Sequence, residues 1–164
     1  MSGDGQVRGF SVEDWPWILT LNAANEVETS KLAEAEMPKI ARESWAMLAC
    51  GKEAFLVAYD EASAYASPNF LWFRARYPDF VYVDRVVVAA HARGRGLAGA
   101  LYEKLIEEAR GTPGCSRIVC EVNFDPPNPA SDAFHARMGF EEVGRARLAN
   151  GKAVRYFCRD LGGG

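Results

Sequence analysis

The sequence lacks the features that mark several classes of protein. Its formal net charge is −3, and it has no block of like charges, so it shows neither the basic patch of a nucleic-acid-binding domain nor that of a membrane-surface helix. Its apolar runs are shorter than the roughly 18 residues that a membrane-spanning helix needs. The start of the chain, MSGDGQVRGF, lacks the basic and then apolar profile of a secretory signal. These absences predict a cytoplasmic protein without nucleic-acid or membrane partners.

Histidine and cysteine are also scarce. The chain has two histidines and four cysteines, and the cysteines fall in or beside apolar segments without metal-site spacing: Cys50, Cys115, Cys120 and Cys158. Because free cysteine packs as a small apolar residue, we expect reduced thiols and no metal. No repeat, low-complexity linker or change in composition divides the 164 residues. This predicts one domain over 1–164 with disordered ends at about 1–5 and 161–164.

The apolar periodicity predicts a mixed order of helices and strands. The predicted helices are Glu13–Asn25, Pro38–Ala49, Gly96–Arg110 and Asn128–Gly139, and the predicted strands are Val7–Phe10, Ala54–Tyr59, Phe80–Ala89, Ser116–Val122, Glu141–Leu148 and Ala153–Arg159. Asn128-Pro129 reads as an N-cap followed by the first helical residue. Asn150-Gly151 is the pair that type I′ hairpins prefer. The polar and aromatic stretch 60–79 is long for an ordinary connection.

Three glycines stand between a predicted strand and a predicted helix in the segment 92–101, ARGRGLAGAL. The spacing Gly94-x-Gly96-x-x-Gly99 matches the dinucleotide fingerprint, and Glu121 follows 22 positions later, near where that fingerprint expects an acid. Two observations argue against an NAD-dependent oxidoreductase. The residues Ala89–Arg93 intervene between the strand and the first glycine, where the dinucleotide turn is tight, and only one helix and one hairpin follow Glu121.

The position of the glycine loop at the start of a predicted helix indicates an anion-binding site. The first N–H groups of a helix have no partner within the helix and attract negative charge, phosphate most strongly. Arg93 and Arg95 add positive charge to the same place. The loop therefore predicts a phosphate-bearing cofactor, with a helix start that serves packing alone as the alternative.

Two segments carry a resemblance to a known family. Arg93–Ala98, RGRGLA, resembles the Arg/Gln-x-x-Gly-x-Gly/Ala signature of the GCN5-related N-acetyltransferases, which bind acetyl-coenzyme A. Val86–Val88 resembles the strand whose backbone pairs with the pantetheine arm in that family. Asn128–Phe140 is similar to the family's Asn-x-x-Ala-x-x-x-Tyr-x-x-x-Gly-Phe segment. The resemblance covers roughly Tyr82–Gly144, and both segments occur in the family's order.

The resemblance implies a fold, a cofactor and a reaction. The fold would be mixed α/β, with a mostly antiparallel sheet of six or seven strands and helices on both faces. The family's strands 4 and 5, here Phe80–Ala89 and Ser116–Val122, would form a splayed pair. The protein, a monomer or homodimer, would transfer an acetyl group from acetyl-CoA to a primary amine of a small molecule or a peptide, by direct attack in a ternary complex. The implied cofactor residues are Val86, Val87, Val88, Arg93, Gly94, Arg95, Gly96, Leu97, Ala98, Gly99 and Asn128.

The reaction needs a base, an oxyanion donor and a proton for the departing thiolate. The resemblance places the base at Glu121, with Asp84 as its rival, and the donor at the backbone N–H of Val88. The family's common tyrosine, taken as the acid in many members, is His135 here, as in the branch that acetylates phosphinothricin-like amines. We expect His135 to protonate the thiolate. Structural roles for Glu121 and His135 are the alternatives.

The amine acceptor leaves the weakest trace in the sequence. The aromatic stretch with Tyr65 and Phe70 is a candidate lid, and Asn25 ends a helix that could face the site. The candidate acceptor-binding residues are Asn22, Asn69, Trp72, Phe73 and Asp84, and packing beneath a long loop is the alternative. Besides the NAD enzyme, a non-catalytic acyl-CoA sensor on the same fold is a second alternative function.

Overall fold

One sheet runs through the residues that the structure describes, which are 6–26, 29–125 and 127–162. In this computed structural model the described strands lie in the order β1-β2-β3-β4-β5-β7-β6, and each neighbouring pair is antiparallel except β4 and β5. The strands are β1 (Val7–Gly9), β2 (Ala46–Cys50), β3 (Ala54–Asp60), β4 (Val81–Val88), β5 (Arg117–Asp125), β6 (Glu141–Arg147) and β7 (Ala153–Asp160). This sheet confirms the predicted mixed α/β fold.

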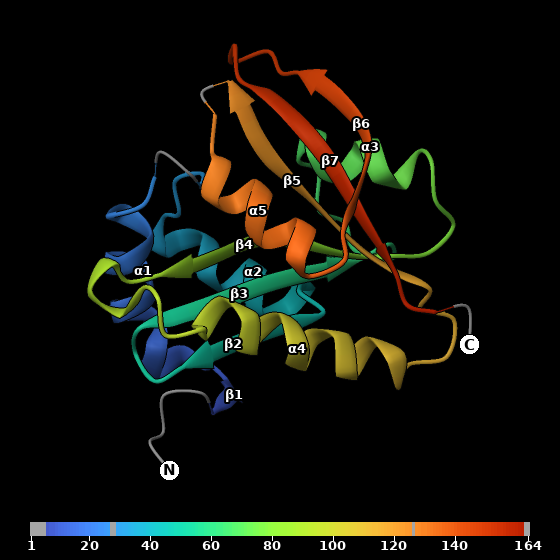
Figure 1. Cartoon of the computed structure of the whole chain (residues 1–164). Coiled ribbons are helices and arrows are strands. Elements are labelled where there is room, and N and C mark those ends of the chain that lie inside the picture. Colours follow the sequence, from blue (N-terminus) through green and yellow to red (C-terminus); the bar gives the residue numbers. More distant parts are fainter. Residues whose placement is uncertain (1–5, 27–28, 126, 163–164) are drawn as a thin grey trace.

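Helices cover both faces of the sheet (Figure 1). They are α1 (Trp15–Ala23), α2 (Met37–Glu43), α3 (Pro68–Arg74), α4 (Leu97–Arg110) and α5 (Pro129–Arg137). Because side chains alternate along a strand, Leu56 of β3 packs with α4 and α5 on one face, whereas its neighbours Phe55 and Val57 pack with α1, α2 and α3 on the other. Among the described residues, no helix is long and apolar enough to cross a membrane.

The parallel pair β4–β5 is joined over a short length only. Its register consists of Val81 opposite Ile118 and Tyr82 opposite Val119, and beyond these residues the two strands diverge into a wedge (Figure 1). The predicted splay of strands 4 and 5 is therefore confirmed. The divergence leaves the later half of β4 with a sheet partner on its β3 side alone among the described strands.

The helix predicted over Pro38–Ala49 is wrong beyond Glu43. The strand β2 begins at Ala46, and the backbone N–H of Trp45 already donates to the Ala58 carbonyl of β3 at 2.7 Å. This strand lies between β1 and β3 and is largely buried, so its residues form a nearly continuous apolar run. Periodicity does not distinguish such a run from the end of a buried helix.

The turn and the chain end also differ from the sequence prediction. A type I′ turn needs positive φ at both Asn150 and Gly151, but only Gly151 has it, with φ 87°. The Gly151 N–H donates to the Leu148 carbonyl at 2.9 Å, so the hairpin closes through a longer loop. Leu161, predicted to be disordered, is buried, and its N–H donates to the Ser116 carbonyl at 3.0 Å. The other ends predicted to be disordered, 1–5 and 163–164, lie outside the described residues.

Candidate functional site

A cleft of about 600 Å³ opens where β4 meets the start of α4. We call it the glycine-loop cleft. It is lined by Asn25, Thr29, Val86, Val87, Val88, Ala92, Arg93, Gly94, Gly96, Leu97, Ala98, Gly99, Asn128, Ala130, Ser131, Phe134, His135 and Arg137. The structure thus brings together all the residues that were predicted to bind the cofactor, with one exception. Arg95 lies outside this lining and donates instead to Glu53 Oε1 at 2.6 Å.

The backbone of the glycine loop is bent so that helix α4 begins at the cleft. Gly94 and Gly96 have φ angles of 85° and 77°, in the left-handed region that side chains disfavour. Gly96 is the N-cap of α4, so the first N–H groups of the helix stand at the cleft wall. Arg93 lies beside them and donates to Asn25 Oδ1 at 2.9 Å. The loop therefore offers free backbone donors, a helix dipole and a guanidinium to an anion.

Helix α5 closes the other side of the cleft. The Asn128 side chain accepts the Ser131 N–H at 3.3 Å, which confirms the predicted N-cap. His135, one turn further on, is only 4% exposed. Its ring stacks on Phe157 with a centroid distance of 6.0 Å and meets Phe140 edge-on at 5.3 Å. The imidazole is thus part of the apolar floor beneath the cleft.

Both ring nitrogens of His135 are occupied by fixed partners. Nδ1 lies 2.8 Å from the Ser131 carbonyl and Nε2 lies 2.8 Å from the Tyr102 hydroxyl. A carbonyl only accepts, so Nδ1 carries a proton, and in the neutral ring Nε2 then accepts from the Tyr102 hydroxyl. Burial also lowers the pKa of His135, which favours the neutral ring. This geometry argues against the predicted role of His135 as the acid, because the one N–H of the neutral ring is already hydrogen-bonded to the Ser131 carbonyl.

A second cavity of about 380 Å³ lies in the wedge between β4 and β5. We call it the polar pocket. It is lined by Thr29, Ser30, Tyr65, Ser67, Pro68, Asn69, Tyr82, Asp84, Glu121, Asn123, Leu148, Ala149, Asn150, Lys152 and Val154. Thr29 lines both this pocket and the glycine-loop cleft, so the two cavities share a wall.

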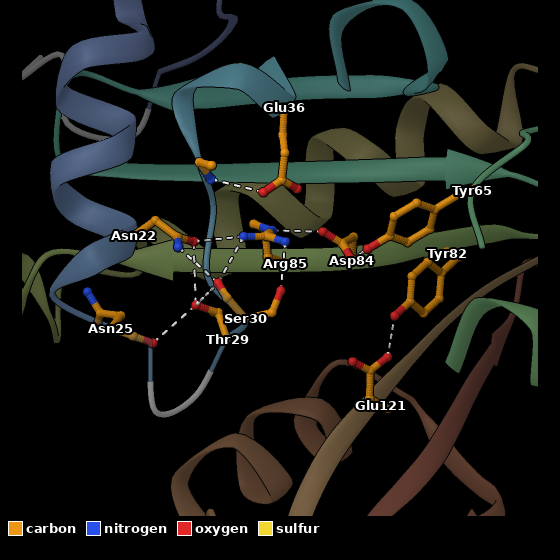
Figure 2. A network of polar contacts seen from close by, with 11 residues as sticks. Asn22, Asn25, Thr29, Ser30, Glu36, Tyr65, Tyr82, Asp84, Arg85 and Glu121 are labelled. Carbon is orange, nitrogen blue, oxygen red and sulfur yellow. Dashed lines mark hydrogen bonds and ion pairs between the residues drawn. The ribbon is translucent and has the colours of Figure 1, made fainter. Parts of the chain in front are cut away.

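Glu121 is the carboxylate at the β5 side of the polar pocket. The Tyr82 hydroxyl of β4 donates to Glu121 Oε1 at 2.6 Å (Figure 2). Burial raises the pKa of Glu121 to about 8, with Asp84 adding to the rise and the Tyr82 hydrogen bond opposing it. A carboxyl group with a pKa in this range exchanges protons near neutral pH, as a general base must.

Asp84 faces the same pocket from β4, but its oxygens are engaged. Oδ2 accepts from Arg85 Nε at 2.7 Å and Oδ1 accepts from the Tyr65 hydroxyl at 2.6 Å. Figure 2 shows Asp84 between these two donors, while Glu121 reaches in from the opposite strand. Asp84 is therefore held as a fixed negative charge beside Glu121.

The structure separates the candidate acceptor-binding residues. Asn69 and Asp84 line the polar pocket, whereas Asn22 is buried and accepts from Arg85 Nη1 at 3.0 Å. Trp72 stacks on Tyr156 with ring centroids 4.1 Å apart and lies outside the lining. Phe73 is completely buried in the core. The aromatic stretch thus contains α3; its Phe70 and Phe73 are buried in the core, whereas Tyr65 and Asn69 line the polar pocket.

Sequence reasoning missed several pocket residues. Tyr82 and Ser30 line the pocket, and Arg85 lies behind it, yet none of them belongs to a motif. One signal was present in the sequence: Asp84-Arg85 interrupts the apolar run VYVDRVVV. Two adjacent charges in a buried strand indicate that both are paired, although they do not show with what.

The fold places a cleft at the start of a helix, which favours an anion, beside a pocket that contains two carboxylates. The sequence model of the Acetyltransferase (GNAT) family matches residues 20–140. The chain therefore belongs to the Acetyltransferase (GNAT) family, whose activity is N-acetylation with acetyl-CoA, as the resemblance implied.

The chain is similar to several known proteins in structure or in sequence. The chain is similar to the structure of Arabidopsis thaliana NAA60 in complex with acetyl-CoA, with a TM-score of 0.74 and 19% identity over 96% of this chain and 98% of that one. Ard1 from Thermoplasma volcanium gives a TM-score of 0.72 and 17% identity over 94% and 96% of the two chains. These likenesses show a shared fold. In sequence, 61 residues are 39% identical to glucosamine 6-phosphate N-acetyltransferase 1 of Oryza sativa subsp. japonica, and they cover 37% of this chain and 33% of that relative.

Proposed function

We propose that the chain forms one N-acetyltransferase domain that transfers the acetyl group of acetyl-CoA directly to a compact primary amine held in the polar pocket. The observation that carries this proposal is the placement of both cavities on one strand. Val86 lines the glycine-loop cleft and Asp84 lines the polar pocket. At about 3.3 Å per residue they are roughly 7 Å apart, so a thioester beside Val86 reaches the pocket.

Acetyl-CoA would enter through the glycine-loop cleft. Its phosphates would lie at the start of α4 beside Arg93, where the helix dipole and backbone donors favour anions. The N–H of Ala89 donates to the Glu53 carbonyl on the β3 side at 2.7 Å. Because backbone groups of successive strand residues point to opposite edges, Val86 and Val88 turn theirs into the wedge. This alternation supports pairing of Val86 with the pantetheine arm and donation by Val88 to the oxyanion.

Glu121 would act as the base, directly or through water. The amine enters as an ammonium ion, Glu121 removes its proton, and the nitrogen attacks the thioester carbon. As the C–S bond breaks, the nitrogen loses its second proton to solvent and becomes the amide, and coenzyme A leaves as a thiolate that takes a proton from solvent. Glu121 is favoured over Asp84 because Asp84 already accepts from both Arg85 and Tyr65. The assignment of His135 as the acid is not retained, because its ring is buried and both ring nitrogens already have hydrogen-bond partners.

The polar pocket supports a compact cationic acceptor. Two carboxylates face it, and hydroxyl and amide groups surround them. The rim comes from the Thr29–Ser30 segment, the start of α3 and the turn 148–152. A volume of about 380 Å³ accommodates a small amine or one terminal residue of a peptide. We propose that the acceptor is the small amine, because three segments of the chain surround the carboxylates and enclose the pocket.

The test is a screen of primary amines and of peptides with free amino termini, followed by detection of released thiol in the presence of acetyl-CoA. We expect acetylation of at least one small amine, lost in Glu121→Gln. Acetyl-CoA should also raise the melting temperature, whereas NAD should not, because a ligand of the folded state alone stabilises it. Stabilisation by NAD alone would overturn the assignment. Acetyl-CoA binding without transfer to any amine would instead identify a non-catalytic acyl-CoA sensor.

A further inference from the structure

Arg85 of β4 is a buried cation at the centre of a polar network (Figure 2). The residue is 6% exposed, and each of its three nitrogens is engaged. Nε donates to Asp84 Oδ2 at 2.7 Å, Nη1 donates to Asn22 Oδ1 at 3.0 Å and to the Ser30 carbonyl at 3.2 Å, and Nη2 donates to Ser30 Oγ at 2.9 Å. A planar guanidinium fork suits such a set of fixed acceptors, whereas an ammonium does not.

A bulge in β4 makes this arrangement possible. Opposite β3, Val57 pairs with Arg85 and Ala58 pairs with Val83, so Asp84 is an extra residue in the ladder. In a regular strand Asp84 and Arg85 would point to opposite faces. The extra residue places both side chains on one face, where they form an ion pair of 2.7 Å that is almost entirely buried.

The partners of Arg85 belong to the wall shared by the two cavities. Ser30 lines the polar pocket and Thr29 lines both cavities. Asn22 Nδ2 donates to the same Ser30 carbonyl at 3.0 Å, and the Thr29 N–H donates to the Asn25 carbonyl at 3.1 Å. Arg85 therefore fixes this wall on one side and Asp84 on the other, without lining either cavity itself.

We propose that Arg85 is a positioning residue for the acceptor: its guanidinium sets the distance between the Thr29–Ser30 wall and Asp84, and so fixes the shape and charge of the polar pocket. The acceptor itself contacts the wall and the carboxylates, not Arg85. This inference rests on the proposed function for its kinetic consequences, whereas the clamp on the wall is a property of the folded protein alone.

Three variants separate the contributions of the contacts that Arg85 makes with Asp84, Asn22 and Ser30, which we call the clamp. Arg85→Met removes the charge and every hydrogen bond while keeping much of the volume. Arg85→Lys keeps a cation beside Asp84 but loses the fork, and Ser30→Ala removes only the side-chain acceptor. Arg117→Met is the matched control, because Arg117 is a partly buried arginine of β5 that pairs with Asp79 at 3.6 Å outside both cavities.

The kinetic test compares the effect of each variant on the acceptor KM with its effect on acetyl-CoA affinity. In Arg85→Met and Arg85→Lys we expect the acceptor KM to rise about tenfold or more, as for loss of a charged hydrogen bond, and in Ser30→Ala by less. Acetyl-CoA affinity, measured by calorimetry, should stay within about threefold of the original protein, and Arg117→Met should change neither value. A parallel loss of acceptor and acetyl-CoA binding would overturn the proposal.

The pH profile distinguishes positioning from simple packing. Around Glu121 lie the titratable side chains of Tyr82 and Asp84 on β4, Tyr156 on β7, Tyr102 on α4 and Cys120 on β5. The charge of Asp84 raises the pKa of Glu121, and Arg85 offsets that charge. The acidic limb of kcat/KM should therefore move to higher pH in Arg85→Met and stay in place in Arg85→Lys. Equal profiles in both variants would contradict this role.

Hydrogen exchange tests the clamp without any acceptor. In Arg85→Met and Ser30→Ala, the backbone amides of peptides that contain Thr29 and Ser30 should exchange faster than in the original protein. The amides of peptides from α4 should keep the rates of the original protein. Unchanged exchange around Ser30 would overturn the proposal even if activity fell. If no amine is acetylated, the proposed function fails, and the exchange rates still decide whether Arg85 holds the wall. Should Arg85→Met not fold, Arg85→Lys and Ser30→Ala provide the same comparison.

Discussion

The glycine-loop cleft and the polar pocket lie on the same strand but are built in different ways. Most of the cleft comes from one continuous stretch, Val86–Gly99, and it offers backbone N–H groups at the start of a helix. The pocket is assembled from side chains of β4, β5, β7, α3 and the Thr29–Ser30 segment. A ligand recognised by backbone leaves a local motif in the sequence, whereas a ligand recognised by scattered side chains leaves none.

The two regions also differ in charge and in how that charge affects the stability of the fold. The cleft offers N–H donors and Arg93, whose side chain is exposed and donates to Asn25 Oδ1. The pocket contains Glu121, whose pKa burial raises to about 8, close to the fixed charge of Asp84. Such a site destabilises the fold when it ionises, as active sites commonly do. Four predictions test this contrast.

The largest effect should follow from Glu121→Gln. We expect kcat/KM for the acceptor to fall by about 10²–10⁴, because general base catalysis is lost, while acetyl-CoA affinity changes less than about threefold. Steady-state kinetics with thiol detection and calorimetry measure the two quantities. Glu141→Gln, an exposed position of β6, is the control and should be unchanged. Activity of Glu121→Gln within a factor of ten of the original protein would assign the base elsewhere.

Gly96→Glu should disable the cleft and leave the pocket intact. It places a negative charge where the helix start favours anions, so we expect acetyl-CoA affinity to fall about 100-fold or more by calorimetry. A Cβ at Gly96 would meet no atom within 4 Å, but the φ of 77° strains any side chain. Gly96→Gln carries that strain without the charge and should bind more tightly than Gly96→Glu. Equal affinity in these two variants would mean that no phosphate lies there.

His135→Ala should lower stability more than turnover. It removes a buried ring and leaves the Tyr102 hydroxyl without its acceptor at 2.8 Å, which should reduce the free energy of unfolding by about 2–4 kcal/mol. We expect kcat to fall less than about tenfold. Urea denaturation and kinetics on the same preparation decide between the roles. A loss of 100-fold in kcat with unchanged stability would restore His135 as the acid.

A further effect should appear in the pH dependence of stability. The folded pKa of Glu121 is about 8, against an ordinary value of 4.5, so between these values the folded state holds a proton that the unfolded state has lost. Stability relative to Glu121→Gln should therefore fall as pH rises from about 4.5 to 8, by up to roughly 1.4 kcal/mol per pH unit. Urea denaturation at pH 5 and pH 8 tests this. A difference between the two proteins that does not change with pH would contradict the raised pKa.

Elements with a local cause could be predicted from the sequence. Gly96 and Gly111 bracket α4, and Asn128 caps α5 through its own side chain, so both helices lie where their residues indicate. The strands β4 and β7 follow from their apolar and β-branched residues. The strand β2 could not be predicted, because its apolar run fits a helix equally well until β1 and β3 pair with it.

The same division holds within the candidate site. The sequence by itself determined the glycine loop of the cleft, since the bends at Gly94 and Gly96 and the start of α4 are properties of consecutive residues. Only the tertiary structure decided that Arg95 leaves the cleft for Glu53 and that His135 is enclosed by aromatic rings. It also decided the polar pocket. A bulge at Asp84 and the splay of β4 from β5 bring together side chains that are far apart along the chain, and such contacts depend on packing between elements, not on the order of residues within one.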